Sequence, residues 1–270
     1  MKKTIIFTLF VFLELISCKP ETGNQAIEKG VLTMEENITL SNIIIIDIYD
    51  NVGFDSKFKT GFGFGCIVKT GNKTILFDTG SDSPTLLANL QTAGIKPEEI
   101  EIIVLSHIHG DHTGGLLGFL EKNPDVKVYI PSSFPPSFKE QIKSAGATVA
   151  DVSNPTKIIE GVYSTGELGT LIKEQSLTIN SDKGLIVITG CAHPGIVNIV
   201  EKAREMFGRN VYLVMGGFHS PPISVAKEFR ELGVEKTAPS HCTGDEATEA
   251  FADEYKDDFI KSGAGKEIKI

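Results

Sequence analysis

The sequence has no block of basic residues that could hold a phosphate backbone. Its 26 lysines and arginines are outnumbered by 35 aspartates and glutamates, which gives a formal net charge of −9. Nucleic-acid binding needs clustered positive charge, so no nucleic-acid partner is expected. Short-period repeats and low-complexity tracts are also missing. A composition of 41% apolar and 23% charged residues is typical of an ordinary globular protein.

Cysteine is scarce, with four residues in the chain. Beyond Cys18, the remaining Cys66, Cys191 and Cys242 form an odd, sparse set, which excludes a disulfide framework. Cys191 and Cys242 each lie within two residues of a histidine, so they are candidates for metal ligands or thiol nucleophiles. The favoured interpretation is that both are small buried residues that pack beside a site.

The N-terminus has no apolar run of the roughly 20 residues that a membrane span needs. Lys2 and Lys3, followed by the short apolar run 5–16, instead predict a secretory signal. The sequence LISC at 15–18 resembles a bacterial lipobox, in which the cysteine is lipidated and becomes the mature N-terminus. A plain signal peptide and a buried N-terminal strand are the alternatives.

We therefore expect a lipoprotein signal peptide over residues 1–17, a polar tether over 18–40 and one folded domain over 41–270. Such a protein would be anchored through Cys18 in the inner or outer membrane of a bacterial cell envelope. Its catalytic domain would lie outside the cytoplasm.

From residue 42 onward, short apolar runs alternate with helical patterns. The isoleucine-rich run 42–48 and the run 73–77 predict strands, while the leucine spacing over 83–93 and the apolar face of 196–207 predict helices. Both halves of the domain show this alternation, which favours mixed sheets covered by helices on the outside. Residues 131–182 are expected to supply loops over a pocket, and within them SSFPPSF at 132–138 is expected to be either a lid or rim of the pocket or an inert connection.

The histidines are few but concentrated. Each of the six follows a predicted strand by a few residues at most: His107, His109, His112, His193, His219 and His241. Loops at strand ends are where such folds build their sites, and neutral imidazole is the commonest protein ligand of zinc and similar ions. The pattern therefore predicts a metal site in preference to scattered, solvated histidines.

The stretch SHIHGDHTGG at 106–115 carries three of these histidines together with Asp111. On extended backbone, His107 and His109 at spacing i, i+2 point to one side. Beyond the turn that Gly110 permits, Asp111 and His112 can face a second ion. A distant histidine can complete each set once the chain has folded.

Two other kinds of catalytic site are not supported. Ser106 and Ser220 both neighbour a histidine, but no nucleophile-elbow pattern surrounds either serine. The glycines of GFGFG at 61–65 do not open a predicted helix, so a dinucleotide-binding loop is not expected.

SHIHGDHTGG resembles the HxHxDH signature of the metallo-β-lactamase superfamily. ILFDTG, which contains Asp78, resembles the first motif of that family, TGCAHPG the third and PSHCTG the last. IYDN, EQSL and GGFHS are similar to the branch named 7,8-dihydropterin-6-yl-methyl-4-(β-D-ribofuranosyl)aminobenzene 5′-phosphate synthase-like proteins. The resemblance spans roughly residues 42–265. It implies an α+β fold, an αββα sandwich of two mixed β-sheets flanked by helices, with a dinuclear metal site at one edge.

The resemblance also implies a set of site residues. The first metal would be held by His107, His109 and His193, and the second by Asp111, His112 and His241. Asp78 would accept hydrogen bonds that orient ligand histidines.

Most of the superfamily bridges the two ions with an aspartate before the last histidine. The matching strand end here reads MGGFHS, and no aspartate lies between His193 and His241. His219 is the candidate for that place, either as a further metal ligand or as a donor to the substrate. A site with one tight and one weak ion therefore stays open.

The activity that the resemblance implies is a metal-dependent hydrolase using a metal-activated water at a one- or two-metal site, on a small-molecule substrate. Two Zn²⁺ ions are expected, with iron or manganese as alternatives. Asp111, which would orient the water, and His219, which would donate to developing negative charge, are the catalytic candidates. The alternatives are group transfer on a pterin-like or phosphorylated substrate, redox chemistry at iron, and a non-catalytic surface lipoprotein. Neither the substrate nor the oligomeric state follows from the sequence.

Overall fold

The computed structural model describes residues 38–71 and 73–270. The expected signal peptide, the Cys18 anchor and nearly all of the tether lie outside these residues. Within the described part of the chain, no helix combines the length and apolarity that crossing a membrane would require.

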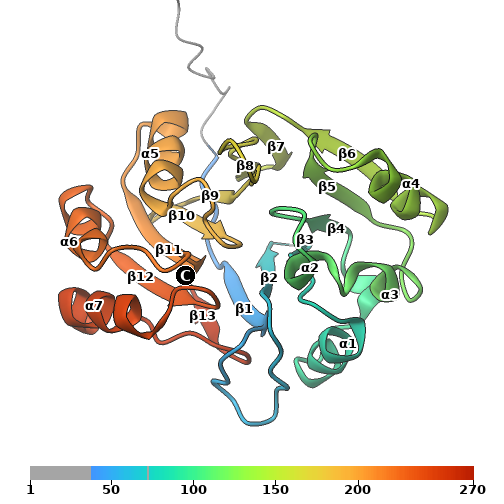
Figure 1. Ribbon diagram of the computed structural model, residues 1–270, viewed down its shortest axis with the longest axis horizontal. Coiled ribbons are helices and arrows are strands. Elements are labelled where there is room, and N and C mark those ends of the chain that lie inside the picture. Colours follow the sequence, from blue (N-terminus) through green and yellow to red (C-terminus); the bar gives the residue numbers. More distant parts are fainter. Residues whose placement is uncertain (1–37, 72) are drawn as a thin grey trace, which may run out of the picture. The chain divides into compact units, whose positions relative to one another are not determined.

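Two mixed β-sheets face each other, and helices cover the outer face of each (Figure 1). The strand order is β13-β1-β2-β3-β4-β5-β6 in the seven-stranded sheet and β12-β11-β10-β9-β8-β7 in the six-stranded sheet. The pairs from β3 to β6 are parallel, as are β10 with β11 and β11 with β12, while the other pairs are antiparallel. The predicted α+β sandwich is confirmed.

The strands of the seven-stranded sheet are β1 (Ile44–Tyr49), β2 (Gly65–Thr70), β3 (Lys73–Phe77), β4 (Ile102–Val104), β5 (Lys127–Pro131), β6 (Thr148–Val152) and β13 (Glu267–Lys269). Those of the six-stranded sheet are β7 (Thr156–Ile159), β8 (Val162–Ser164), β9 (Leu177–Ser181), β10 (Gly184–Thr189), β11 (Val211–Gly217) and β12 (Lys236–Ser240). The α-helices are α1 (Ser83–Thr92), α2 (Gly110–Thr113), α3 (Leu116–Leu120), α4 (Pro136–Ser144), α5 (Ile196–Phe207), α6 (Ser224–Glu231) and α7 (Asp245–Tyr255). Short 3₁₀ turns lie at Pro97–Glu99 and Lys256–Asp258.

The isoleucines around β1 show why this sequence forms the central layer. Side chains alternate across a strand. Ile45 therefore packs into the core between the two sheets, whereas Ile46 and Ile48 pack on the other face, against the layer that contains α1 and α3. Because both faces of this sheet are covered, the strand is mostly apolar, with the buried Asp47 as its one charged residue, and shows no polar–apolar alternation.

The start of α1 and the end of α5 lie at residues that commonly begin and end helices. Asp82 caps α1 by accepting the backbone N–H of Thr85, and Pro84 stands in the first turn. The apolar face of α5 is buried on the six-stranded sheet, and the helix ends at Gly208, whose φ of 63° suits glycine.

The expectation that residues 131–182 supply loops over a pocket is wrong for about half of that segment, which forms α4 and the strands β6 to β9, but residues 168–172 do border a cavity beside His193. These strands include short pieces, such as TVADV and VYS, whose mixed polarity gives no clear period. Within SSFPPSF, Phe134 is buried in the core beneath α4 and Pro136 begins that helix. This stretch is therefore a structural connection and not a lid.

Candidate metal centre

The site lies where the loops after β4, β10 and β12 meet. Ser106 and His107 follow β4 directly, and His109 precedes α2, which carries Asp111 and His112. The loop after β10 brings Cys191 and His193, and the residue after β12 is His241. Donor atoms from both sheets thus converge at one edge of the sandwich.

His107, His109 and His193 form the first group of donors. Nε2 of His107 lies 3.1 Å from Nδ1 of His109, and the ring of His193 lies 4.7 Å and 4.8 Å from these two rings, centre to centre. Among the described residues, the buried Nε2 of His193 has no hydrogen-bond partner. An unpartnered buried nitrogen facing two further imidazoles is the arrangement expected of three ligands that share one ion.

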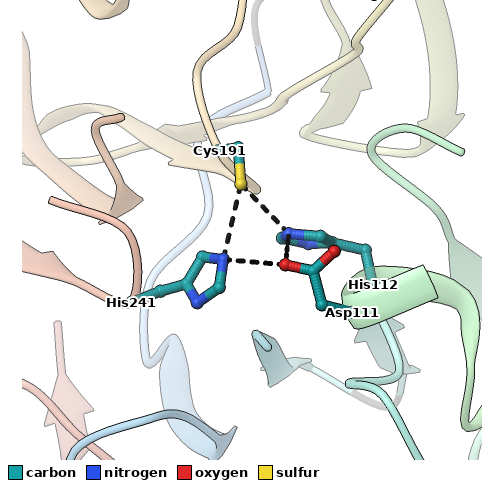
Figure 2. Close-up of side chains that lie close together, drawn as sticks. All are labelled: Asp111, His112, Cys191 and His241. Atoms are coloured by element: carbon teal, nitrogen blue, oxygen red, sulfur yellow. Dashed lines mark hydrogen bonds and ion pairs between the residues drawn. The ribbon is translucent and has the colours of Figure 1, made fainter. Parts of the chain in front are cut away.

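The second group consists of Asp111, His112, Cys191 and His241 (Figure 2). Oδ2 of Asp111 lies 3.4 Å from Nε2 of His112 and 3.4 Å from Nε2 of His241. Ligand atoms about 2.0–2.1 Å from a tetrahedral ion lie about 3.3–3.4 Å apart, so these separations are those of a coordination shell. Both groups fit a divalent metal ion such as zinc by donor type and spacing.

Oxygen acceptors fix the tautomers of three of these histidines. Nδ1 of His107 lies 2.9 Å from Oγ of Ser106, and Nδ1 of His241 lies 3.0 Å from Oδ1 of Asn51. Nδ1 of His112 lies 2.7 Å from Oδ2 of Asp78. Each Nδ1–H can donate to its oxygen, which leaves the lone pair on Nε2, the atom that faces the centre.

Asp78 is fully buried and accepts hydrogen bonds from both Ser106 and His112. Its Oδ1 accepts the backbone N–H of Ser106 at 2.6 Å, and its Oδ2 accepts the hydroxyl of the same serine at 2.6 Å as well as the hydrogen bond from His112. Its φ of 57° places it in the left-handed region, which aspartate tolerates better than most residues. Asp78 thus stands in the orienting position that the family resemblance implies.

The electrostatic surroundings of the two groups differ. Burial and the neighbouring imidazoles lower the pKa of His107, which keeps it neutral and able to bind metal. Burial also opposes a charge on His112, but Asp78 and Asp111 outweigh it and raise the pKa of this imidazole to about 10. The second group therefore favours a positive charge, whether that of a proton or that of a metal ion.

Glu174 is a functional candidate that the sequence did not reveal, although it stands in the EQSL stretch. Its Oε1 accepts the backbone N–H groups of Gly190, Cys191 and Ala192 at 2.9–3.2 Å, and its Oε2 accepts that of His193 at 2.8 Å. One buried carboxylate thus holds the loop that carries donors for both groups. A glutamate in a loop has no periodic signal, so only the folded chain identifies this role.

Cys191 and Cys242 were expected to pack beside the site. Cys191 is instead in the second group, with its sulfur 3.2 Å from Nε2 of His112 and 3.4 Å from Nε2 of His241. The neighbouring Cys242 and burial raise the pKa of the Cys191 thiol. A coordinated cation has the opposite effect, because it deprotonates a bound thiol.

His219 joins neither group in the described part of the chain. It clusters with Cys191 and Cys242, within 4.8 Å donor to donor, and its ring lies 4.4 Å from that of His193. Its side chain is exposed, and its φ is 57°. The structure therefore places His219 at the rim, on the side of the first group.

Two cavities flank the centre. One of about 510 Å³ is bounded by His193 and by the segment 168–172, where Leu171 is 96% exposed. Another of about 610 Å³ lies against Ser220, Ile223 and Thr243, with Asp245 and Glu246 in its wall. No lysine, arginine, tyrosine or phenylalanine is among the described residues that line either of these two cavities, but a smaller cavity of about 190 Å³, bounded by His241, includes Phe259 and Lys261.

Comparison with known proteins agrees with this geometry. Residues 61–225 match the family model described as the Metallo-beta-lactamase superfamily. The chain is 32% identical, over 82% of its own length and 94% of the relative's, to the 7,8-dihydropterin-6-methyl-4-(beta-D-ribofuranosyl)-aminobenzene-5'-phosphate synthase of Methanocaldococcus jannaschii.

Among solved structures, Tm1679, described as a metal-dependent hydrolase of the beta-lactamase superfamily, shares 26% identity. It superposes with a TM-score of 0.70 over 84% of this chain and 99% of its own. The metallo-beta-lactamase fold protein YhfI of Bacillus subtilis, at 15% identity and a TM-score of 0.64, covers 85% of this chain and 99% of its own, and shows the fold alone.

Proposed function

The chain belongs to the metallo-β-lactamase superfamily, and from that premise we propose that it is a metal-dependent hydrolase acting on a small molecule. The observation that carries the proposal is the meeting of two adjacent donor groups, built from loops of both sheets, at one edge of the sandwich. His107, His109 and His193 would hold one ion, and Asp111, His112 and His241 a second.

Divalent ions, when bound, acidify a coordinated water and polarise the group to be cleaved. The protein supplies orientation. Asp111 stays ionised, because hydrogen bonds from His112 and His241 lower its pKa against the effect of burial. Its carboxylate can therefore accept a hydrogen bond from an attacking water. His219, exposed at the rim, can donate one to the negative charge that develops on the substrate.

We place hydrolysis of a small molecule before chemistry on a phosphorylated pterin, because two of the cavities at the centre lack the side chains that usually bind such a substrate. A phosphate group is usually bound by arginine or lysine, and a pterin ring by stacked aromatic side chains. Neither residue class lines the cavities beside His193 and Ser220 within the described chain, whereas the smaller cavity beside His241 includes Phe259 and Lys261. Group transfer on a pterin- or phosphate-linked substrate remains the second candidate, because a relative at 32% identity bears the name of such a synthase.

A substrate screen with a single ligand variant tests the proposal. We expect the metal-loaded protein to hydrolyse at least one member of a panel of esters, lactones, thioesters and phosphodiesters. His109→Ala should lower kcat/KM by about 100-fold or more, since even residues that only support metal ligands cost about 10–100-fold.

All six histidines lie in or beside the site, so the matched control is a truncation elsewhere. Gln91→Ala, on the exposed side of α1, should retain full activity. Activity that survives His109→Ala unchanged, or a fully active protein without bound metal, would contradict the proposal.

A further inference from the structure

We propose that Cys191 binds the metal ion of the second group as a thiolate, in the place of the carboxylate that this chain lacks. The inference rests on the proposed metal centre and adds a ligand to it. It also assigns different tasks to the two ions.

The missing carboxylate cannot be restored at the end of β11. A Cβ atom on Gly216 would lie 2.0 Å from the carbonyl oxygen of Thr189. One on Gly217 would lie 2.4 Å from the carbonyl oxygen of Gly190 and 2.7 Å from the sulfur of Cys242. The backbone at the end of β10 and in the loop that follows it therefore occupies the space in which side chains at Gly216 and Gly217 would lie, and Cys191 belongs to that loop.

The sulfur of Cys191 occupies a corner of the second group (Figure 2). It lies 3.2 Å from Nε2 of His112 and 3.4 Å from Nε2 of His241, and both nitrogens also lie 3.4 Å from Oδ2 of Asp111. Four donors with sulfur about 2.3 Å and nitrogen about 2.0–2.1 Å from one ion would show separations of about 3.3–3.6 Å. Four of the six separations among the sulfur, the two nitrogens and the oxygen are thus close to those of a coordination shell, and all four atoms lie within 4.8 Å of one another.

The direction of the side chain is fixed by the backbone. Glu174 accepts the N–H groups of residues 190–193, so the loop is held with the Cys191 sulfur facing polar atoms. A cysteine that only packs would face apolar neighbours, yet Cys191 is 4% exposed and its sulfur faces two imidazole nitrogens. Burial among donors of this kind is typical of a ligand.

Four protein ligands would close the coordination of the second ion, as in structural zinc sites. The group of His107, His109 and His193 has three protein ligands and leaves a position open. His193 also lines the cavity of about 510 Å³. The substrate would therefore meet the three-histidine ion, while the second ion holds the loops of the two sheets together.

Cobalt substitution tests the role of Cys191, with Cys242 as the matched control because both cysteines lie in the same cluster. Full-length protein loaded with Co²⁺ should show visible bands from bound cobalt and a near-ultraviolet band from thiolate-to-cobalt charge transfer. Cys191→Ser should abolish the charge-transfer band and weaken binding of the second cobalt by at least about 10-fold. Cys242→Ser should retain the band.

Three results would overturn the inference, and they are distinguishable. If the unaltered protein shows visible cobalt bands but no charge-transfer band, the proposed metal centre is supported and the proposed thiolate ligand is refuted. Loss of the charge-transfer band in Cys242→Ser, with retention in Cys191→Ser, would move the ligand to Cys242. Failure to bind cobalt at all would overturn the proposed function itself.

A measurement on the unaltered protein guards against a variant that fails to fold. X-ray absorption of the zinc-loaded chain should require a sulfur scatterer at about 2.3 Å from part of the zinc. A shell of nitrogen and oxygen alone would contradict the inference.

Discussion

At the residue scale, the centre depends on side chains that touch the ligands without binding metal. Asp78 accepts hydrogen bonds from Ser106 and His112, and Ser106 in turn lies within hydrogen-bonding distance of His107. One carboxylate therefore fixes histidines of both donor groups. Asn51 does the same for His241 from a residue 190 positions away in the chain.

Asp78→Asn tests this orienting role while keeping the backbone conformation, because asparagine also tolerates the left-handed region. The amide nitrogen can no longer accept the hydrogen bond from His112 or from Ser106, so the affinity for metal should fall by about 10–100-fold. Competition with a chromogenic chelator measures this affinity. The exposed Asp125→Asn serves as the control and should bind metal normally. Equal affinities in the two variants would show that Asp78 has no part in the centre.

At the element scale, the loop between β10 and α5 decides the architecture of the site. It contributes Cys191 to one donor group and His193 to the other, and a single side chain, Glu174, satisfies its backbone N–H groups. Hydrogen bonds to a charged acceptor are stronger than neutral ones. We therefore regard Glu174 as the residue that positions this loop.

Glu174→Gln should loosen the loop, because the amide nitrogen offers a donor where backbone donors already point. We expect the free energy of unfolding of the metal-free protein to fall by about 1.5–3 kcal/mol, the scale of a hydrogen bond to a charged group. Metal affinity should fall as well. Urea denaturation measures the first effect and chelator competition the second.

The matched control for that substitution is Glu205→Gln. Glu205 pairs with Lys202 on the surface of α5, where an ion pair is worth about 0–1 kcal/mol. If both variants unfold at the same urea concentration as the unaltered chain, the positioning role of Glu174 is refuted.

At the scale of the whole molecule, the centre joins the two sheets. In each donor group, some ligands come from the chain that follows β4 of the seven-stranded sheet. The others come from the loops after β10 or β12 of the six-stranded sheet. A metal ion that binds both sets stabilises the folded state by mass action, by about 2.7 kcal/mol at a free concentration 100 times its dissociation constant.

Removal of metal should therefore lower the thermal midpoint of the whole domain in a single transition. Circular dichroism of the full chain, before and after dialysis against a chelator, measures the change. Zinc restored to the dialysed protein should return the midpoint, whereas magnesium, which prefers six oxygen ligands, should not. A midpoint that is indifferent to zinc would argue against ions that span the sheets.

The sequence by itself determined the elements and the local part of the site. Apolar periodicity located β1, β3, α1 and α5, because short-range patterns decide which face of an element is buried. HxHxDH at 107–112 identified the family, because four potential donors stand together in the chain. The short strands β6 to β8 escaped detection, since their pairing partners and not their own residues stabilise them.

Only the tertiary structure decided the roles of Cys191, Glu174 and Asn51. Each acts through partners that folding brings close: Cys191 meets His112 across 79 positions and His241 across 50. A cysteine or a glutamate has no fixed role until its neighbours are known, because burial and adjacent charges set its protonation and its bonds. The sequence favoured a packing role for Cys191, and the three-dimensional arrangement makes it a candidate metal ligand.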